Sequence, residues 1–208
     1  MRKYDLAIFD IDGTLSDSFP WFLRVANVVA DKHRFKRIED NEIESLRSLS
    51  AREMIKHLRV PLWRLPLIAR DVRAMKSAAL GEIPLFAGVP EMLGQLAAQG
   101  VVVAVVSSDN EANVRRALGE LARHVTHFAC GASMFGKAAK FRRVLKAANV
   151  PAARVIAIGD EVRDVEAARE AGIDFGAVSW GYTAPDALRR LAPQMMFGAV
   201  GEIAPALA

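Results

Sequence analysis

The chain has 208 residues, of which 52% are hydrophobic and 25% charged, a balance that is typical of globular proteins and excludes a disordered one. This length suits one sizeable core, or a core domain with a smaller insertion, and is too short for two full-sized domains. The net charge of +4 favours an anionic substrate. The basic residues are spread along the chain and do not form the basic stripe of a nucleic-acid-binding protein.

Cysteine usage and apolar runs indicate the compartment. Cys130 is the single cysteine, so no intrachain disulfide forms and a reducing compartment is permitted. Aspartates interrupt the apolar run near the start, and no apolar stretch approaches the roughly 18 residues of a membrane span. We therefore expect a soluble, cytoplasmic protein without membrane or nucleic-acid partners.

The first predicted strand is "YDLAIF", residues 4–9, and two aspartates follow it in "DIDGT". Side chains two residues apart on an extended chain project to the same side, so Asp10 and Asp12 both face a site at the tip of this strand. Gly13 then lets the chain turn sharply. Because Asp and Gly are common after strands, the motif alone leaves a structural turn and a functional site open.

Residues 17–83 carry helical patterns and no convincing strand. "FPWFLRVANVVADKH" is amphipathic, and "SAREMIKHL" offers Ser50 and Glu53 as a capping box. "PLWRLPLIARDVRAMKSAAL" is broken by Pro66 into two helices or one kinked helix. We interpret 17–83 as a helical insertion that forms a lid above the strand ends, and 1–16 with 84–208 as a discontinuous core domain.

The predicted lid leaves the substrate open. Its basic residues could meet a carboxylate or a second phosphate, although a solvated helix face is the simpler interpretation; they are Arg47, Arg52, Lys56, His57 and Arg59. We expect the aromatic side chains of Trp21, Phe22 and Trp63 to pack inside the lid and not against a ligand.

The rest of the chain alternates between strand and helix. Predicted strands cover residues 101–106, 126–130, 154–159 and 174–179, with a short edge strand at "MMF". Predicted helices cover 88–100, 110–121, 140–150 and 163–173. This order predicts an α/β fold with a doubly wound, mainly parallel sheet, in which ligands bind outside the carboxyl ends of the strands.

A second acidic cluster follows the strand at 154–159. Asp160 comes directly after this strand, and Asp164 lies near the start of the next helix, where an acid is also favoured by the helix dipole. Carboxylates that converge on one end of a sheet repel each other unless a cation joins them, and hard oxygen ligands suit Mg²⁺. The sequence therefore predicts a Mg²⁺ site that includes Asp10 and Asp160, with Asp164 as either a ligand or a helix cap.

Groups that bind phosphate are predicted nearby. Ser107 and Ser108 end the second core strand and supply hydroxyl and backbone donors at the same edge. Lys137 and Lys140 lie near a helix start, and either ammonium balances phosphate charge. We favour Lys137, because it follows Gly136 and precedes the periodic segment.

These signals, "DIDGT", "VVSS", "GK" and "GDEVRD" in this order, resemble the four motifs of the haloacid dehalogenase superfamily of phosphohydrolases. The resemblance runs over about residues 4–182, and "LFAGVPEMLGQLAAQG" is similar to its phosphoglycolate phosphatase-like branch. It implies a Rossmann-like core with an inserted all-helical cap between the first two motifs.

The resemblance also implies a role for each residue. Asp10 would be the nucleophile that forms an aspartyl-phosphate, and Asp12 would protonate the leaving alkoxide and then deprotonate water. The implied Mg²⁺ ligands are the carboxylates of Asp10 and Asp160, the backbone carbonyl of Asp12, and Asp164 as a further ligand. The implied substrate-binding residues are Ser107, Ser108 and Lys137.

Three departures from the family pattern leave questions open. The second motif often reads Thr-Asn, whereas here Asp109 and Asn110 follow the two serines. Ala138 replaces the usual proline after the lysine, which leaves Lys137 and Lys140 as alternatives. Glu161 stands where the family frequently has Ser or Thr, and its role is unassigned.

The resemblance implies a Mg²⁺-dependent phosphatase that hydrolyses a small phosphorylated metabolite, a phosphoglycolate-like monoester, as a monomer or homodimer. A sugar-phosphate mutase similar to β-phosphoglucomutase uses the same intermediate and stays an alternative. A catalytically silent anion-binding module is a third, although intact Asp10, Asp12, Lys137 and Asp160 speak against it. An aspartate at position 12 disfavours dehalogenation.

Overall fold

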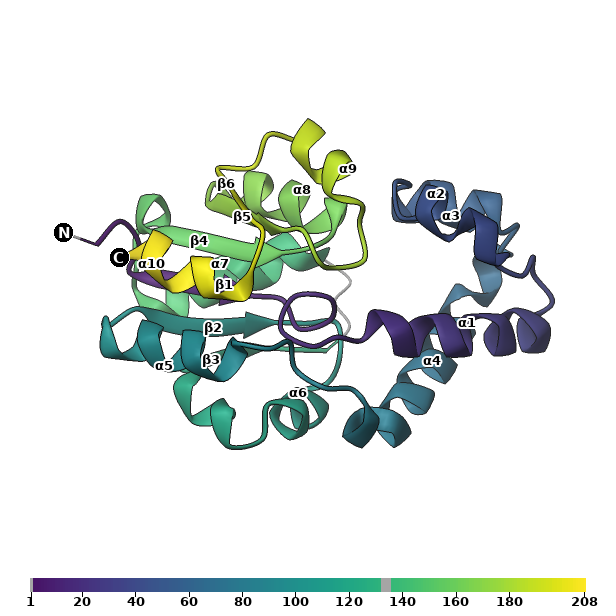
Figure 1. Cartoon of the computed structure of the whole chain (residues 1–208), viewed down its shortest axis with the longest axis horizontal. Helices are drawn as coiled ribbons and strands as arrows, with labels where there is room; N and C mark the ends of the chain where they lie inside the picture. Colours follow the sequence, from purple (N-terminus) through teal and green to yellow (C-terminus); the bar gives the residue numbers. More distant parts are fainter. Residues whose placement is uncertain (1, 132–135) are drawn as a thin grey trace.

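The structure, a computed structural model, describes residues 2–131 and 136–208. Within these residues six strands form one parallel sheet in the order β3-β2-β1-β4-β5-β6 (Figure 1). The strands are β1 (Leu6–Phe9), β2 (Val102–Val106), β3 (His127–Ala129), β4 (Val155–Gly159), β5 (Asp174–Val178) and β6 (Met195–Phe197). The predicted α/β fold is confirmed, including the short edge strand at "MMF".

Helices cover both faces of the sheet because its strands are apolar on both sides. In β1, Ala7 and Phe9 pack into one core with α5, α6 and α10, whereas Leu6 and Ile8 pack into the other with α7, α8 and α9. These helices are α5 (Val89–Ala98), α6 (Glu111–Leu118), α7 (Gly136–Ala148), α8 (Val162–Ala171), α9 (Pro185–Arg190) and α10 (Ile203–Leu207).

Four further helices lie beyond the carboxyl ends of the strands, on the side opposite both chain termini (Figure 1). They are α1 (Phe19–His33), α2 (Ile43–Leu46), α3 (Ala51–His57) and α4 (Leu65–Ala79). All of them fall within residues 17–83, and every strand of the described sheet falls outside that range. The division into a cap domain and a discontinuous core domain stays a prediction.

Local signals in this helical segment account for its helix ends. Ser50 accepts from the backbone N–H of Glu53 at 3.3 Å and its own backbone N–H donates to the Glu53 carboxylate at 2.8 Å, which confirms the predicted capping box. Pro66 begins a helix and breaks none: it lies in the first turn of α4, where a missing N–H costs nothing. In the described residues no helix has both the length and the apolarity that crossing a membrane requires.

The expected packing of the aromatic residues is only partly right. Trp21 on α1 is buried, whereas Trp63 is 70% exposed, so its prediction as interior packing is wrong. Trp63 lies in a 3₁₀ turn before α4, and the Arg64 guanidinium carbon lies 4.5 Å from its ring centroid. That contact leaves most of the indole in water.

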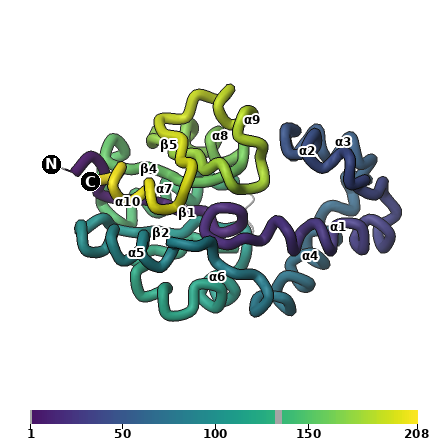
Figure 2. The backbone as a smooth tube through the Cα atoms, viewed as in Figure 1, coloured from purple at the N-terminus to yellow at the C-terminus, as the bar shows by residue number. Residues whose placement is uncertain are grey.

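The chain passes between the sheet and the helical segment along two adjacent stretches. The N–H of Asp17 donates to the carbonyl of Pro84 at 2.9 Å, and the N–H of Phe86 donates to the carbonyl of Leu15 at 3.0 Å. Figure 2 shows the backbone looping after β1 before it enters α1. This loop holds Asp12, so the link to the helical segment starts within the candidate site.

Candidate functional site

The site lies where the strand order reverses. β1 pairs with β2 on one side and β4 on the other, with Phe9 opposite Ile158. Asp10 leaves β1 with its N–H donating to the carbonyl of Ile158 at 3.0 Å, and Asp160 follows the end of β4. Open parallel sheets bind their ligands at such a switch point, because the loops diverge there and leave a crevice.

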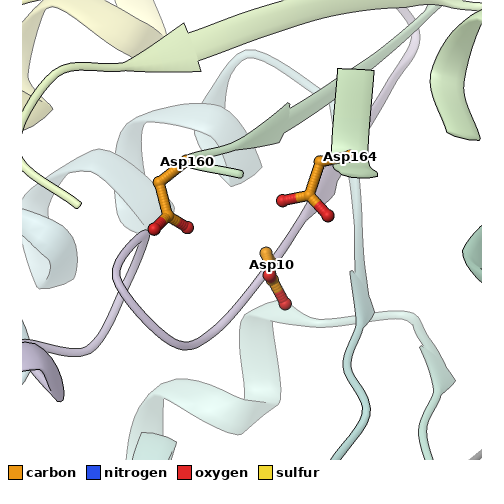
Figure 3. A group of neighbouring side chains, drawn as sticks. All are labelled: Asp10, Asp160 and Asp164. Atoms are coloured by element: carbon orange, nitrogen blue, oxygen red, sulfur yellow. The ribbon is translucent and has the colours of Figure 1, made fainter. Parts of the chain in front are cut away.

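Three carboxylates meet at this point. Asp10, Asp160 and Asp164 each offer an oxygen, and these oxygens lie within 4.8 Å of one another; all three residues are buried. Figure 3 shows the three side chains around one space. The structure therefore brings together three of the four predicted metal residues through their carboxylates.

Asp160 is held from two sides. The Thr14 hydroxyl donates to Oδ1 at 2.9 Å, and the backbone N–H of Tyr182 donates to Oδ2 at 2.7 Å. The Asp160 side chain passes close to the backbone at two glycines. A Cβ at Gly13 would collide with the Asp160 carboxylate and lie 2.6 Å from the Tyr182 ring. A Cβ at Gly181 would overlap Asp160 as well. Gly13 also has φ +71°, so the motif requires glycine for two reasons.

Asp164 caps a helix and also lies in the acidic cluster, whereas its function as a metal ligand stays a prediction. Its side chain accepts from the backbone N–H of Glu161 at 3.4 Å, which caps α8. Its other oxygen lies 2.7 Å from the Lys137 ammonium, beside Asp10. One aspartate therefore both ends the loop and contributes to the acidic cluster.

The cluster carries more negative charge than its surroundings balance. Burial, then the charges of Glu161, Asp10 and Asp164, raise the pKa of Asp160 well above its ordinary value. Burial and Asp10 likewise raise the pKa of Asp164. Lys137 supplies one positive charge, 2.8 Å from Asp10 Oδ2; burial lowers the pKa of this ammonium, but the two carboxylates raise it by more.

An all-oxygen, buried and under-neutralised set of this kind fits a hard divalent cation such as Mg²⁺. A bound cation would lower the raised pKa values of Asp160 and Asp164 by favouring their ionised forms. The Asp12 carboxylate is outside the cluster. If Asp12 is a ligand, it contributes its backbone carbonyl, as the family resemblance implies.

The predicted phosphate-binding residues line one cavity of about 370 Å³ together with Asp10. The buried Ser107 hydroxyl accepts from the N–H of Asp109 at 3.1 Å, which leaves its own O–H to donate, and Ser108 is exposed. Lys137 contacts Asp10, whereas the Lys140 ammonium donates to the backbone carbonyls of Ser107 and Gly131. The geometry thus separates the two lysines: one faces the carboxylates, and the other fixes the serine loop.

The sequence interpretation missed a third lysine, Lys76. Lys76 on α4 is 7% exposed, and its ammonium lies 2.6 Å from Asp12 Oδ2 and 3.2 Å from Asp109 Oδ2. Burial lowers the pKa of Lys76, but the carboxylates of Asp12 and Asp109 raise it overall. Asp12 Oδ1 is buried and has no hydrogen-bond partner among the described residues. A side chain from the helical segment thus contacts one of the two aspartates in the first motif.

Glu161, left without a role by the sequence, is the N-cap residue of α8 and pairs with Arg163. Burial raises the pKa of Glu161 to about 7, with a further contribution from Asp164 and an opposing one from Arg163. Glu161 and Arg163 line a further cavity with Asp12 and Lys76, between the sheet and the helical segment.

The chain is similar in sequence to known proteins. The model of the haloacid dehalogenase-like hydrolase family matches residues 7–178. A phosphoglycolate phosphatase from Synechococcus elongatus is 29% identical over 194 residues, covering 91% of this chain and 90% of that protein. An N-acetylmuramic acid 6-phosphate phosphatase from Pseudomonas aeruginosa is 24% identical over 192 residues, covering 86% and 83%.

The same architecture occurs among solved structures. A haloacid dehalogenase-like family hydrolase from Streptococcus pneumoniae superposes with a TM-score of 0.83 and 17% identity, and 99% of each chain is covered. This agreement concerns the fold, since the sequences have diverged widely.

Proposed function

Because the chain belongs to the haloacid dehalogenase-like hydrolase family and is a phosphoric monoester hydrolase, we propose that it hydrolyses a small phosphorylated metabolite with Mg²⁺ through an aspartyl-phosphate. The observation that carries this proposal is the buried carboxylate cluster at the strand ends, with the Lys137 ammonium 2.8 Å from Asp10. The curated relatives that act on phosphoglycolate and on N-acetylmuramic acid 6-phosphate support a small substrate.

Asp10 is the proposed nucleophile. Its Oδ1 accepts from the N–H of Ile11 at 2.8 Å, which fixes the carboxylate plane, and Lys137 lies at Oδ2. An Asp10 oxygen attacks phosphorus, the bond from phosphorus to the ester oxygen breaks, and the alkoxide leaves with the electron pair of that bond. Lys137 and the Ser107 hydroxyl are placed to meet the negative charge that spreads over the phosphoryl oxygens.

Asp12 is the proposed proton carrier. Its Oδ1, which has no hydrogen-bond partner among the described residues, is the atom that donates a proton to the leaving alkoxide and then accepts one from the water that cleaves the aspartyl-phosphate. Lys76 holds the other oxygen and so restricts the rotation of this carboxylate. The two steps restore both aspartates and consume one water for each ester.

The metal would be held by the Asp10, Asp160 and Asp164 carboxylates and the Asp12 carbonyl. When bound, Mg²⁺ neutralises charge between the nucleophile and the phosphate, two anions that otherwise repel each other. Thr14 and the N–H of Tyr182 orient Asp160 for this purpose.

The proposal is tested by phosphate release from a panel of phosphate esters, with Mg²⁺ and with a chelator. We expect release that needs Mg²⁺ and that Asp10→Asn lowers by about a thousandfold or more. Asp186→Asn, at an exposed aspartate of α9, is the matched control and should retain full activity. Absence of hydrolysis across the panel, or an active Asp10→Asn protein, would contradict the proposal, and phosphoryl transfer between sugar hydroxyls would favour the mutase.

A further inference from the structure

An apolar cavity of about 240 Å³ lies between the helical segment and the loop after β5. Phe19 and Phe22 of α1, Leu46 of α2, and Met54 of α3 line it, and so does Leu49 from the loop between α2 and α3. The lining residues come from α1, α2 and α3, which are separate in the sequence of the helical segment and together enclose the cavity. Such a lining favours an apolar occupant, because most of its side chains offer no hydrogen bonds to replace those a polar group loses.

This cavity adjoins the cavity of the proposed proton carrier, Asp12. Phe22, Glu161 and Tyr182 line it and also line the neighbouring cavity that contains Asp12 and Lys76. The ring of Tyr182 is fixed at this boundary, since its centroid lies 5.0 Å from that of Phe19 and 5.7 Å from that of Phe22. An alcohol that leaves past Asp12 therefore has an apolar space beside it.

The charged residues of the apolar cavity are already engaged. The Arg47 guanidinium donates to the carbonyl of Gly181 at 2.8 Å, to the carbonyl of Tyr182 at 3.1 Å and to Glu44 at 3.0 Å. Glu161, the other charged residue of the described lining, pairs with Arg163. Arg47 thus joins α2 to the loop that supports Asp160.

We propose that this cavity binds an apolar part of the leaving alcohol, so that the preferred substrates are phosphomonoesters that carry an alkyl or aryl group. The inference rests on the proposed phosphatase function and narrows its substrate class. The volume is sufficient, because an apolar cavity of about 150 Å³ already accommodates benzene. A two-carbon acid such as glycolate would leave the cavity empty.

The first test uses calorimetry with ethylphosphonate and hexylphosphonate, which are not hydrolysed, in the presence of Mg²⁺. Each buried methylene is worth up to about a fourfold gain in affinity, so we expect hexylphosphonate to bind about tenfold or more tighter. Equal affinities would overturn the inference, whether or not the protein hydrolyses esters. Tighter binding of hexylphosphonate without any hydrolysis would overturn the proposed function and leave the cavity assignment standing.

Two variants locate the binding. Leu49→Asp places a charge in the cavity and should abolish most of the preference for the hexyl compound. Leu49→Phe narrows the cavity without adding a charge and should lower the preference by less, and ethylphosphonate binding should change less than about twofold in both variants. Leu62→Asp, at a leucine that is 70% exposed, is the matched control and should keep the preference. A preference that survives both Leu49 variants would place the apolar group elsewhere and overturn the assignment.

Discussion

Replacing Lys76 by methionine tests the contact between the helical segment and the candidate site. The ammonium lies between Asp12 and Asp109, and the side chains of Lys76 and Asp109 are 9% and 5% exposed. Methionine keeps much of the length and volume and removes the charge, which leaves two carboxylates facing each other. Removing one partner of a buried ion pair lowers the free energy of unfolding by about 3–5 kcal/mol.

The lower end of that range applies here, because the Asp12 side chain is 26% exposed and can relax toward water. About 3 kcal/mol corresponds to a fall of roughly 6–12 °C in the melting temperature of a chain of this size. Because Lys76 also restricts the proposed proton carrier, we expect kcat to fall by about tenfold or more. Thermal denaturation by circular dichroism and steady-state phosphate release measure the two effects.

Two further variants make the Lys76 test specific. Arg73→Met removes an exposed cation from the same helix and should change the melting temperature by less than about 2 °C. Lys76→Met combined with Asp109→Asn should recover part of the loss, since one of the unpaired charges is then gone. A Lys76→Met protein as stable as the natural one, or a double variant less stable than the single one, would refute the reasoning.

Gly13→Ala would force a Cβ against Asp160 and should raise the Mg²⁺ concentration needed for half-maximal activity about tenfold or more. Gly94→Ala, with open space around it, should leave this concentration unchanged. Equal Mg²⁺ titrations of the two variants would contradict this prediction. The hydrogen bond from Lys32 lowers the pKa of Asp71 from 3.8 to about 2. The ionised Asp71 therefore stabilises the folded protein fully above pH 3.8, and this contribution is lost as the pH falls through 2. Asp71→Asn should flatten the acid side of the melting-temperature profile, and an unchanged profile would contradict it.

The positions of the strands could be predicted from the sequence because each strand is a short, mainly apolar run. The central strands are buried on both faces, whereas the edge strands β3 and β6 are only partly buried. The same pattern predicted which carboxylates meet. Asp10 and Asp160 directly follow strands, and parallel strands that are neighbours bring their ends together. The position of Asp164 could be predicted as well, since the first turn of α8 returns to the end of β4.

Other parts of the site depend on contacts that no local pattern encodes. Lys76 reaches Asp12 across 64 positions of sequence, and a lysine on an amphipathic helix is usually solvated. One signal was present: Val72, Lys76 and Leu80 follow each other at intervals of four, so the lysine lies on the inward face of α4. A charge at such a position requires a buried partner, although the sequence does not say which one.

Lys137 and Lys76 come from different parts of the chain and neutralise different aspartates. Lys137 pairs with Asp10 and Asp164, and all three belong to the sheet and its covering helices. Lys76 pairs with Asp12 and is carried by α4. The proposed nucleophile is therefore neutralised without any help from the helical segment, whereas the proposed proton carrier loses its partner whenever α4 moves away. A displacement of α4 should thus affect proton transfer to the leaving alcohol more than it affects the charge balance at Asp10.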